Sequence, residues 1–160
     1  MKKLLFIIFM SFTNFAISQN VNFKIDNGLI NWKNVYSDSL NTLQLKNNQL
    51  LEFKTDSTGF VKKTNFNDKK LRQLTAEFKI ETQKNKYRVT VFNVKFYAEP
   101  MNLYGGGLSM QTVTEYSIEQ SLIKSDGSIR KTYMGYNLTE TLNPHLVNLF
   151  TIKKQESKNW

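Results

Sequence analysis

The chain has a single histidine, His145, and no cysteine, which limits the chemistry that it can carry. A zinc site needs several nitrogen, sulfur or carboxylate ligands, and one histidine without cysteine does not supply a usual set. A Ser-His-Asp triad would have to be built on this one residue, and the sequence holds no nucleophile elbow. A lone histidine near the start of an expected helix is usually a surface residue. We therefore expect no catalytic residue, no metal and no cofactor.

Paired carboxylates are the other route to hydrolysis, because one group must act as acid while the second acts as base or nucleophile. Glu77 and Glu81 share one face of an expected strand, but Lys79 lies on the same face, which is typical of a solvated surface. Glu115 and Glu119 have the same spacing. Both pairs predict surface charges in preference to a catalytic pair.

The loop expected over residues 98–111 is the best candidate for a binding site. It follows the most regular hairpin of the chain, contains three consecutive glycines at 105–107, and carries several large apolar side chains. The glycine run lacks the lysine and serine or threonine that follow in a phosphate-binding loop. We expect a ligand to contact Tyr97, Glu99, Leu103 and Tyr104. The alternative is that Leu103 and Tyr104 fold back and close one end of the core.

The start of the chain has the pattern of a secretory signal peptide. A basic beginning precedes an uncharged apolar run over residues 4–10, and Ala16 and Ser18 are small residues just before a cut at Gln19. Polar residues interrupt the run, and it is shorter than the roughly 20 apolar residues of a spanning helix. We expect residues 1–18 to be a signal peptide, no transmembrane segment, and a protein exported to the periplasm or outside the cell.

The rest of the chain is expected to form one domain over residues 19–154, with a polar tail at 155–160. The formal net charge is +9, and nineteen lysines carry most of the positive charge beside three arginines. The lysines are scattered, and arginine, whose planar fork suits phosphate, is scarce. We therefore expect no nucleic-acid partner.

Alternating apolar residues predict strands over 29–36 and, more weakly, over 59–66. The clearest element is a hairpin formed by residues 74–82 and 87–97, with Asn85 in the left-handed conformation of its turn. The phase of the return strand changes near Val91, which indicates either a β-bulge or a central strand covered on both faces. These strands place four residues in the expected core: Trp32, Phe78, Ile80 and Val94.

For two segments the sequence does not decide between a helix and a strand. Residues 39–51 fit a helix whose apolar stripe would be Leu40, Leu43, Leu50 and Leu51, capped by Ser37 or Asp38, although three asparagines weaken it. Residues 116–124 fit a strand, and the rival interpretation is a helix over part of 113–123.

The C-terminal part begins with an expected turn at 126–127, followed by a strand over 129–136. The last element is expected to be a helix that Asn143 caps, with Pro144 in its first turn and an apolar stripe that includes Leu146 and Phe150. The order of elements predicts an α+β fold, in which helices pack on one face of an antiparallel sheet.

Three segments resemble a family of exported bacterial proteins known as domain of unknown function number 4468. They are residues 28–36 (GLINWKNVY), residues 86–96 (KYRVTVFNVKF) and residues 149–153 (LFTIK) with the terminal Trp160. The resemblance implies a fold like that of the TATA-binding protein (TBP-like), a curved antiparallel sheet with helices on one side. The family brings no known activity, so it implies no functional residue.

The export signal, the lack of a catalytic constellation and the expected α+β domain favour an exported, non-enzymatic domain that binds an envelope ligand or protein partner. The alternative is a carboxylate-dependent hydrolase that acts on envelope polymers. A pocket with two close carboxylates, one with a raised pKa, would favour the enzyme. An open sheet face or groove without such a pair would favour the binding domain.

Overall fold

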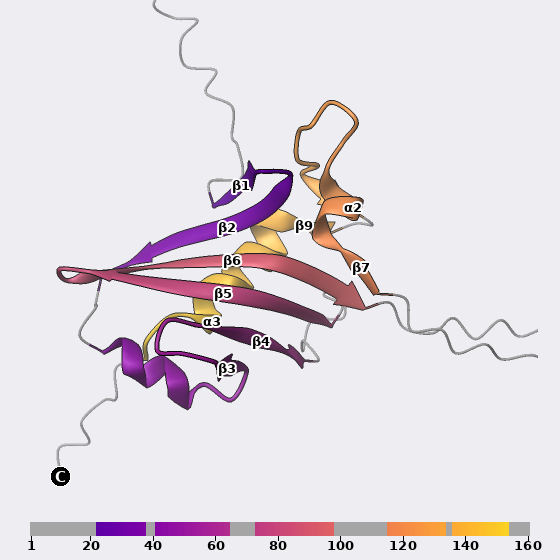
Figure 1. Cartoon of the computed structure of the whole chain (residues 1–160). Helices are drawn as coiled ribbons and strands as arrows, with labels where there is room; N and C mark the ends of the chain where they lie inside the picture. The colour runs from indigo at the N-terminus through magenta and orange to yellow at the C-terminus, as the bar shows by residue number, and fades with distance from the viewer. Residues whose placement is uncertain (1–21, 38–40, 65–72, 98–114, 134–135, 154–160) are drawn as a thin grey trace, which may run out of the picture.

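The computed structural model describes residues 22–37, 41–64, 73–97, 115–133 and 136–153. Its main sheet is antiparallel, with the strand order β1-β2-β6-β5-β4-β3, and β7 pairs with the end of β6 (Figure 1). The strands are β1 (Phe23–Asp26), β2 (Leu29–Tyr36), β3 (Leu51–Phe53), β4 (Thr58–Thr64), β5 (Leu74–Gln83), β6 (Lys86–Tyr97) and β7 (Glu115–Ser117). The long β5–β6 hairpin forms the middle of the sheet.

The hairpin confirms the prediction from period-two alternation. Its turn places Asn85 in the left-handed region with a φ of 59°. The phase change in β6 is a β-bulge: the register runs from Glu77 opposite Phe92 to Thr75 opposite Lys95, so β6 carries one extra residue. Asn93 adopts a φ of 51° there, two residues beyond the expected position.

The segment 39–51 forms less helix than we expected. A 3-10 helix, η1, covers Thr42–Asn47, and Leu51 already belongs to β3. The expected leucine stripe is wrong, because Leu43 and Leu50 are exposed whereas Leu45 is buried. Asparagine is a poor helix former, and a 3-10 helix repeats every three residues, so a different face turns to the core.

The segment 113–123 contains both of the expected alternatives in succession. After β7, Ser117 begins the short helix α2 (Ile118–Leu122), and its hydroxyl and the Gln120 side chain form a capping box. The turn at 126–127 is confirmed, with a φ of 78° at Gly127. The strand expected over 129–136 is wrong: Ile129 makes one isolated bridge to Ile123, and a separate small hairpin follows. Its strands are β8 (Thr132–Tyr133) and β9 (Tyr136–Asn137).

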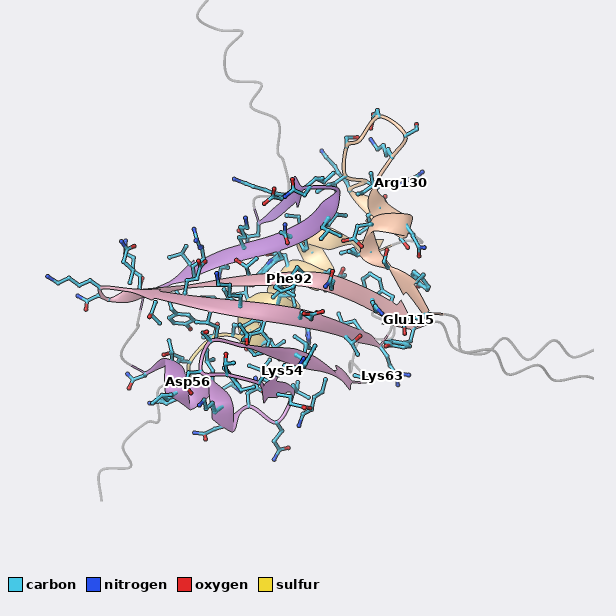
Figure 2. The ribbon with its side chains drawn as sticks, in the orientation of Figure 1. Lys54, Asp56, Lys63, Phe92, Glu115 and Arg130 are labelled. Carbon is cyan, nitrogen blue, oxygen red and sulfur yellow. The ribbon has the colours of Figure 1, made fainter. Side chains whose placement is uncertain are left out.

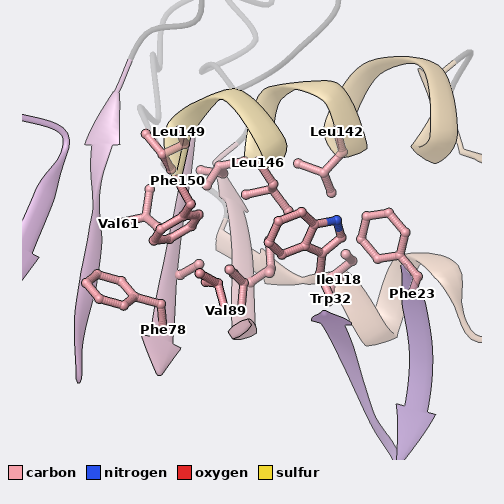
Figure 3. Packing of buried hydrophobic residues seen from close by; sticks show 14 of the residues in the cluster. Phe23, Trp32, Val61, Phe78, Val89, Ile118, Leu142, Leu146, Leu149 and Phe150 are labelled. Atoms are coloured by element: carbon pink, nitrogen blue, oxygen red, sulfur yellow. The ribbon is translucent and has the colours of Figure 1, made fainter. Parts of the chain in front are cut away.

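The core lies between one face of the sheet and the last helix, α3 (Asn143–Leu149), which crosses that face (Figure 3). A π-helical segment, η2 (Leu138–Leu142), runs directly into α3. The residues expected in the core are confirmed as buried: Trp32, Phe78, Ile80 and Val94. Leu142 of η2 and Leu146 and Leu149 of α3 are also buried in this core, and Phe150 follows the helix. The expected α+β class, with helices on one face of a curved antiparallel sheet, is confirmed.

Asn143 has a different role from the expected helix cap. Because η2 continues into α3, the preceding residue is already helical and there is no side-chain cap. The Asn143 Oδ1 instead accepts hydrogen bonds from the Trp32 indole Nε1 at 2.8 Å and from the Asn22 amide at 2.7 Å. The side chain therefore ties the start of α3 to β2 and to the residue that precedes β1.

The C-terminal end of α3 is tied to the sheet by two tyrosines from neighbouring strands. Tyr36 donates to the carbonyl of Val147 at 3.1 Å, and Tyr87 donates to the carbonyl of Phe150 at 2.7 Å. Their rings stack with centroids 4.7 Å apart. These hydroxyls satisfy carbonyls that a helix end leaves without intrahelical partners. In the described ranges, no helix has the length and apolarity that crossing a membrane requires.

Candidate functional site

The second face of the sheet has no described helix over it (Figure 1). Side chains on this open face follow two cross-strand rows. One row runs from β6 to β3 through Phe92, Glu77, Phe60 and Glu52. The adjacent row runs from β2 to β4 through Lys33, Thr90, Lys79 and Thr58. The open face therefore carries half-buried aromatic rings and charges on a stiff scaffold, with Phe92 near its middle (Figure 2).

A hollow of about 680 Å³ lies on this face, toward the end of β6. It is lined by Glu52, Phe60, Val61, Lys62, Lys63, Thr75, Ala76, Glu77, Asn93, Lys95 and Tyr97. A volume of this size is typical of small-molecule sites. We call this hollow the sheet-face site.

Tyr97 is the one predicted site residue that the structure describes, and it lines the sheet-face site. Its hydroxyl lies 3.3 Å from the hydroxyl of Thr75, and the Nζ of Lys63 lies 4.0 Å from the centroid of its ring. The other three predicted residues, Glu99, Leu103 and Tyr104, lie outside the described residues, as does the loop over 98–111.

The sheet-face site also uses residues that our sequence analysis did not select. Asn93, at the bulge, donates its side-chain amide to Glu77 at 2.9 Å. The bulge turns this amide toward β5, because an extra residue changes the direction in which side chains leave the strand. The phase change near Val91 was the sequence signal for it.

Two lysines, one beside the sheet-face site and one in its lining, contact a partner on the sheet. Lys54 lies over the ring of Phe60, with its Nζ 4.1 Å from the centroid. Lys95 forms an ion pair with Glu115 of β7 at 2.6 Å. The hydrogen bond between them raises the pKa of Lys95 and lowers the pKa of Glu115. Figure 2 shows Glu115 and Lys63 at the same end of the sheet.

Neither candidate carboxylate pair forms a catalytic arrangement. Glu81 binds Arg88 at 2.7 Å and Lys79 at 3.3 Å, whereas Glu77 accepts from Asn93. Glu115 and Glu119 belong to different elements, and Glu119 accepts the backbone N–H of Ile30 from across the fold.

The pKa shifts of the carboxyl groups also differ from those of a general acid, whose pKa must be raised toward neutrality. Every shifted carboxyl pKa in the described ranges is lowered, and the largest cause is a hydrogen bond from a neighbouring side chain: Asp56, Glu81, Glu115 and Asp126. The described residues also contain no group of three acidic, histidine or cysteine side chains placed to hold a metal ion.

A second hollow, of about 690 Å³, lies between η1 and α3. We call it the amide hollow, after the five carboxamide residues among those that line it: Gln44, Asn47, Asn48, Gln49 and Asn148. His145 is part of its wall. The expectation that His145 is a surface residue is therefore wrong, since its ring is half-buried and burial lowers its pKa.

The fold is an α+β antiparallel sheet with an open face, and no family model and no curated protein matches the chain. The chain is similar to a solved structure of a TBP-like protein from Parabacteroides distasonis. The two share 15% sequence identity over 79% of this chain and 94% of that chain, with a TM-score of 0.46.

Proposed function

We propose that the chain is an exported, non-enzymatic binding domain of the cell envelope or the extracellular space, and that its ligand rests on the sheet-face site. The ligand belongs to the envelope and is a protein or a small molecule, and nucleic acid is not among its partners. The signal-peptide pattern over residues 1–18 supports export. The three segments quoted above support membership of the family numbered 4468.

The open face of the sheet is the observation that carries this proposal. A sheet face that packs on nothing is usually polar throughout, because exposed apolar area is costly. Here Phe60 and Phe92 lie on it, two strands apart, beside the hollow. Aromatic rings held on stiff strands provide contact area at low cost in conformational entropy.

The arrangement of acids favours binding over hydrolysis. Glu77 and Glu52 line the sheet-face site. They lie opposite Phe60 on its two neighbouring strands, Glu77 on β5 and Glu52 on β3. The carboxyl group of Glu77 already accepts the side-chain amide of Asn93, at 2.9 Å. A carboxyl oxygen that accepts a hydrogen bond in this way can also position a hydroxyl or amino group of a ligand.

The test is capture from solubilised envelope at moderate salt, followed by mass spectrometry of the retained material. Wild type is compared with the double variant Phe60→Ala/Phe92→Ala. Leu43→Ala serves as the control, because Leu43 is an exposed apolar residue on η1. We expect one component that wild type and Leu43→Ala retain and the double variant loses, with its mass unchanged after prolonged incubation.

Two results would contradict the proposal. Equal retention by all three proteins would mean that the open face is not the binding surface. A retained component whose mass falls with time would mean that the chain is an enzyme.

A further inference from the structure

The amide hollow has walls that are fixed relative to each other. Asn48, at the end of η1, donates its side-chain amide to the carbonyl of Leu149 in α3 at 2.9 Å. Its Oδ1 accepts the backbone N–H of Leu50 at 3.0 Å. One side chain therefore joins both walls, and Leu45 anchors η1 in the core beneath them. A hollow held in this way does not have to be ordered when a ligand enters, which favours binding.

The lining of the amide hollow is polar but almost uncharged. Four of its carboxamides are exposed: Gln44, Asn47, Gln49 and Asn148. Among the described residues that line it, Lys153 is the one charged side chain, and none is acidic. The lowered pKa of His145 keeps its ring neutral at neutral pH. Apolar surface comes from Leu45, Leu50, Leu149 and Ile152.

This lining excludes most classes of ligand. Protein sites for metal ions or organic cations usually contain carboxylates that balance the charge, and the described lining has none. A phosphate or polyanion needs several cations, and a lipid tail needs walls without amides. A carboxamide offers both donors and acceptors, which matches a hydroxyl that is itself donor and acceptor. The leucine and isoleucine side chains match the C–H faces that lie between hydroxyls.

We propose that the amide hollow is a binding site for a neutral oligosaccharide. The exposed carboxamides on the two walls bind its hydroxyls, and the apolar floor contacts its C–H faces. The volume of about 690 Å³ lies in the range of sites for small ligands. This site lies between η1 and α3, away from the open face of the sheet, so it goes beyond the function proposed above.

The test uses the purified chain labelled with ¹⁵N and three neutral hexasaccharides, namely chitohexaose, cellohexaose and mannohexaose. A heparin hexasaccharide is the anionic comparison. Side-chain amide signals in the NMR spectrum report directly on the carboxamides. We expect at least one neutral hexasaccharide to shift the signals of Gln44 and Asn148 in a saturable way, while the signal of Asn93 in the sheet-face site stays in place.

Single truncations provide the matched variants. Gln44→Ala and Asn148→Ala each remove one exposed carboxamide from a wall, and we expect each to weaken binding about fivefold, the equivalent of one hydrogen bond. Gln83→Ala removes another exposed glutamine, from the end of β5 and outside the hollow, and leaves binding unchanged. Both kinds of change affect exposed side chains, so the fold is retained.

Three outcomes would overturn the proposal. None of the neutral hexasaccharides shifts the signals of Gln44 and Asn148; only the heparin hexasaccharide binds; or Gln83→Ala weakens binding as much as Gln44→Ala does. Shifts confined to the sheet-face site would assign the sugar to the open face instead. The capture of an envelope component that depends on Phe60 and Phe92 is a separate experiment. The proposal for the sheet-face site and the proposal for the amide hollow can therefore fail independently.

Discussion

The indole of Trp32 donates its Nε1 hydrogen to the side-chain oxygen of Asn143 at 2.8 Å, and this bond joins the second strand of the sheet to the start of the last helix. Trp32 is 1% exposed, so its donor has no access to bulk water. Four residues further along β2, Tyr36 binds the far end of the same helix. One strand therefore fixes both the position and the direction of α3.

Asn143→Ala should lower the free energy of unfolding by about 1–3 kcal/mol, because it leaves the buried indole N–H without its acceptor. Asn148→Ala is the control, since it removes an exposed asparagine from the same helix. Trp32→Phe removes the donor while keeping much of the bulk, and in that background Asn143→Ala should cost less. Trp32→Ala should cost about 3–5 kcal/mol. Urea unfolding measures all of these variants, and a midpoint for Asn143→Ala equal to that of Asn148→Ala would contradict the assignment.

Tyr36 should make the protein sensitive to alkali. Burial raises the pKa of Tyr36 above its ordinary value, and the nearby Tyr87 adds a smaller effect in the same direction. Because the pKa of Tyr36 is higher in the folded than in the unfolded state, the stabilisation from its protonated hydroxyl is complete below about pH 10. It is lost as the pH rises through the pKa of the folded state. We expect the stability of wild type to fall more steeply above about pH 10 than that of Tyr36→Phe. Parallel slopes of the unfolding free energy against pH for the two proteins would show that Tyr36 ionises as freely in the folded state as in the unfolded state.

His145 should act in the opposite pH range. Its pKa is lowered by burial, so below about pH 6.5 the unfolded chain takes up a proton that the folded chain resists. The stabilisation that comes from keeping His145 neutral is complete above the ordinary pKa of histidine. It is lost as the pH falls through the lower pKa that His145 has in the folded state. His145→Gln should therefore lose less stability than wild type between about pH 7.5 and pH 5 in urea unfolding. An identical loss in both proteins would place the ring in water.

Gly59→Ala should be destabilising although the residue lies in a strand. An added Cβ would collide with the backbone oxygen of Glu52 on β3 and lie 2.7 Å from the ring of Phe78. Both neighbours are fixed by packing, so we expect a cost of at least about 1–3 kcal/mol, as for other overpacked cores. Lys62→Ala, three residues along the same strand and exposed, should stay within about 0.5 kcal/mol of wild type. A Gly59→Ala protein as stable as Lys62→Ala would mean that β3 can move away.

Export and cleavage can be checked without any knowledge of the ligand. The small residues Ala16 and Ser18 predict a cut before Gln19. The intact mass of the protein recovered outside the cytoplasm should therefore correspond to a chain that begins at Gln19. Recovery of the chain with residues 1–18 attached would contradict both the cleavage site and the signal-peptide interpretation.

Elements that depend on neighbours in sequence were predicted well. The β5–β6 hairpin follows from period-two alternation, which places every second residue on one face, and from Asn85, which tolerates the left-handed conformation of the turn. The phase change near Val91 left a bulge and a strand covered on both faces as alternatives, and the sheet register contains the bulge. Trp32 and Phe78 were recognised as core residues because they lie on the apolar face of their strands.

The candidate sites were predicted only in part. Tyr97 was selected because it lies at the rim of the loop expected over 98–111, and the structure places it among the residues that line the sheet-face site. Lys63 and Asn93 were not selected, because they come from separate strands that only the sheet register brings together. The amide hollow was missed for the same reason, since its two walls are about 100 residues apart, as the bond from Asn48 to Leu149 shows.

By itself, the sequence determined the fold class, the central hairpin and the expectation of export, because these depend on composition and on the alternation of neighbouring residues. Only the tertiary structure decided that Asn143 accepts from Trp32 in place of capping a helix, and that Leu45 faces the core in place of Leu43. An asparagine has several hydrogen-bond partners of similar energy within its own segment. A distant donor in a site closed to water decides among them, because leaving that donor unsatisfied costs more than any local bond gains.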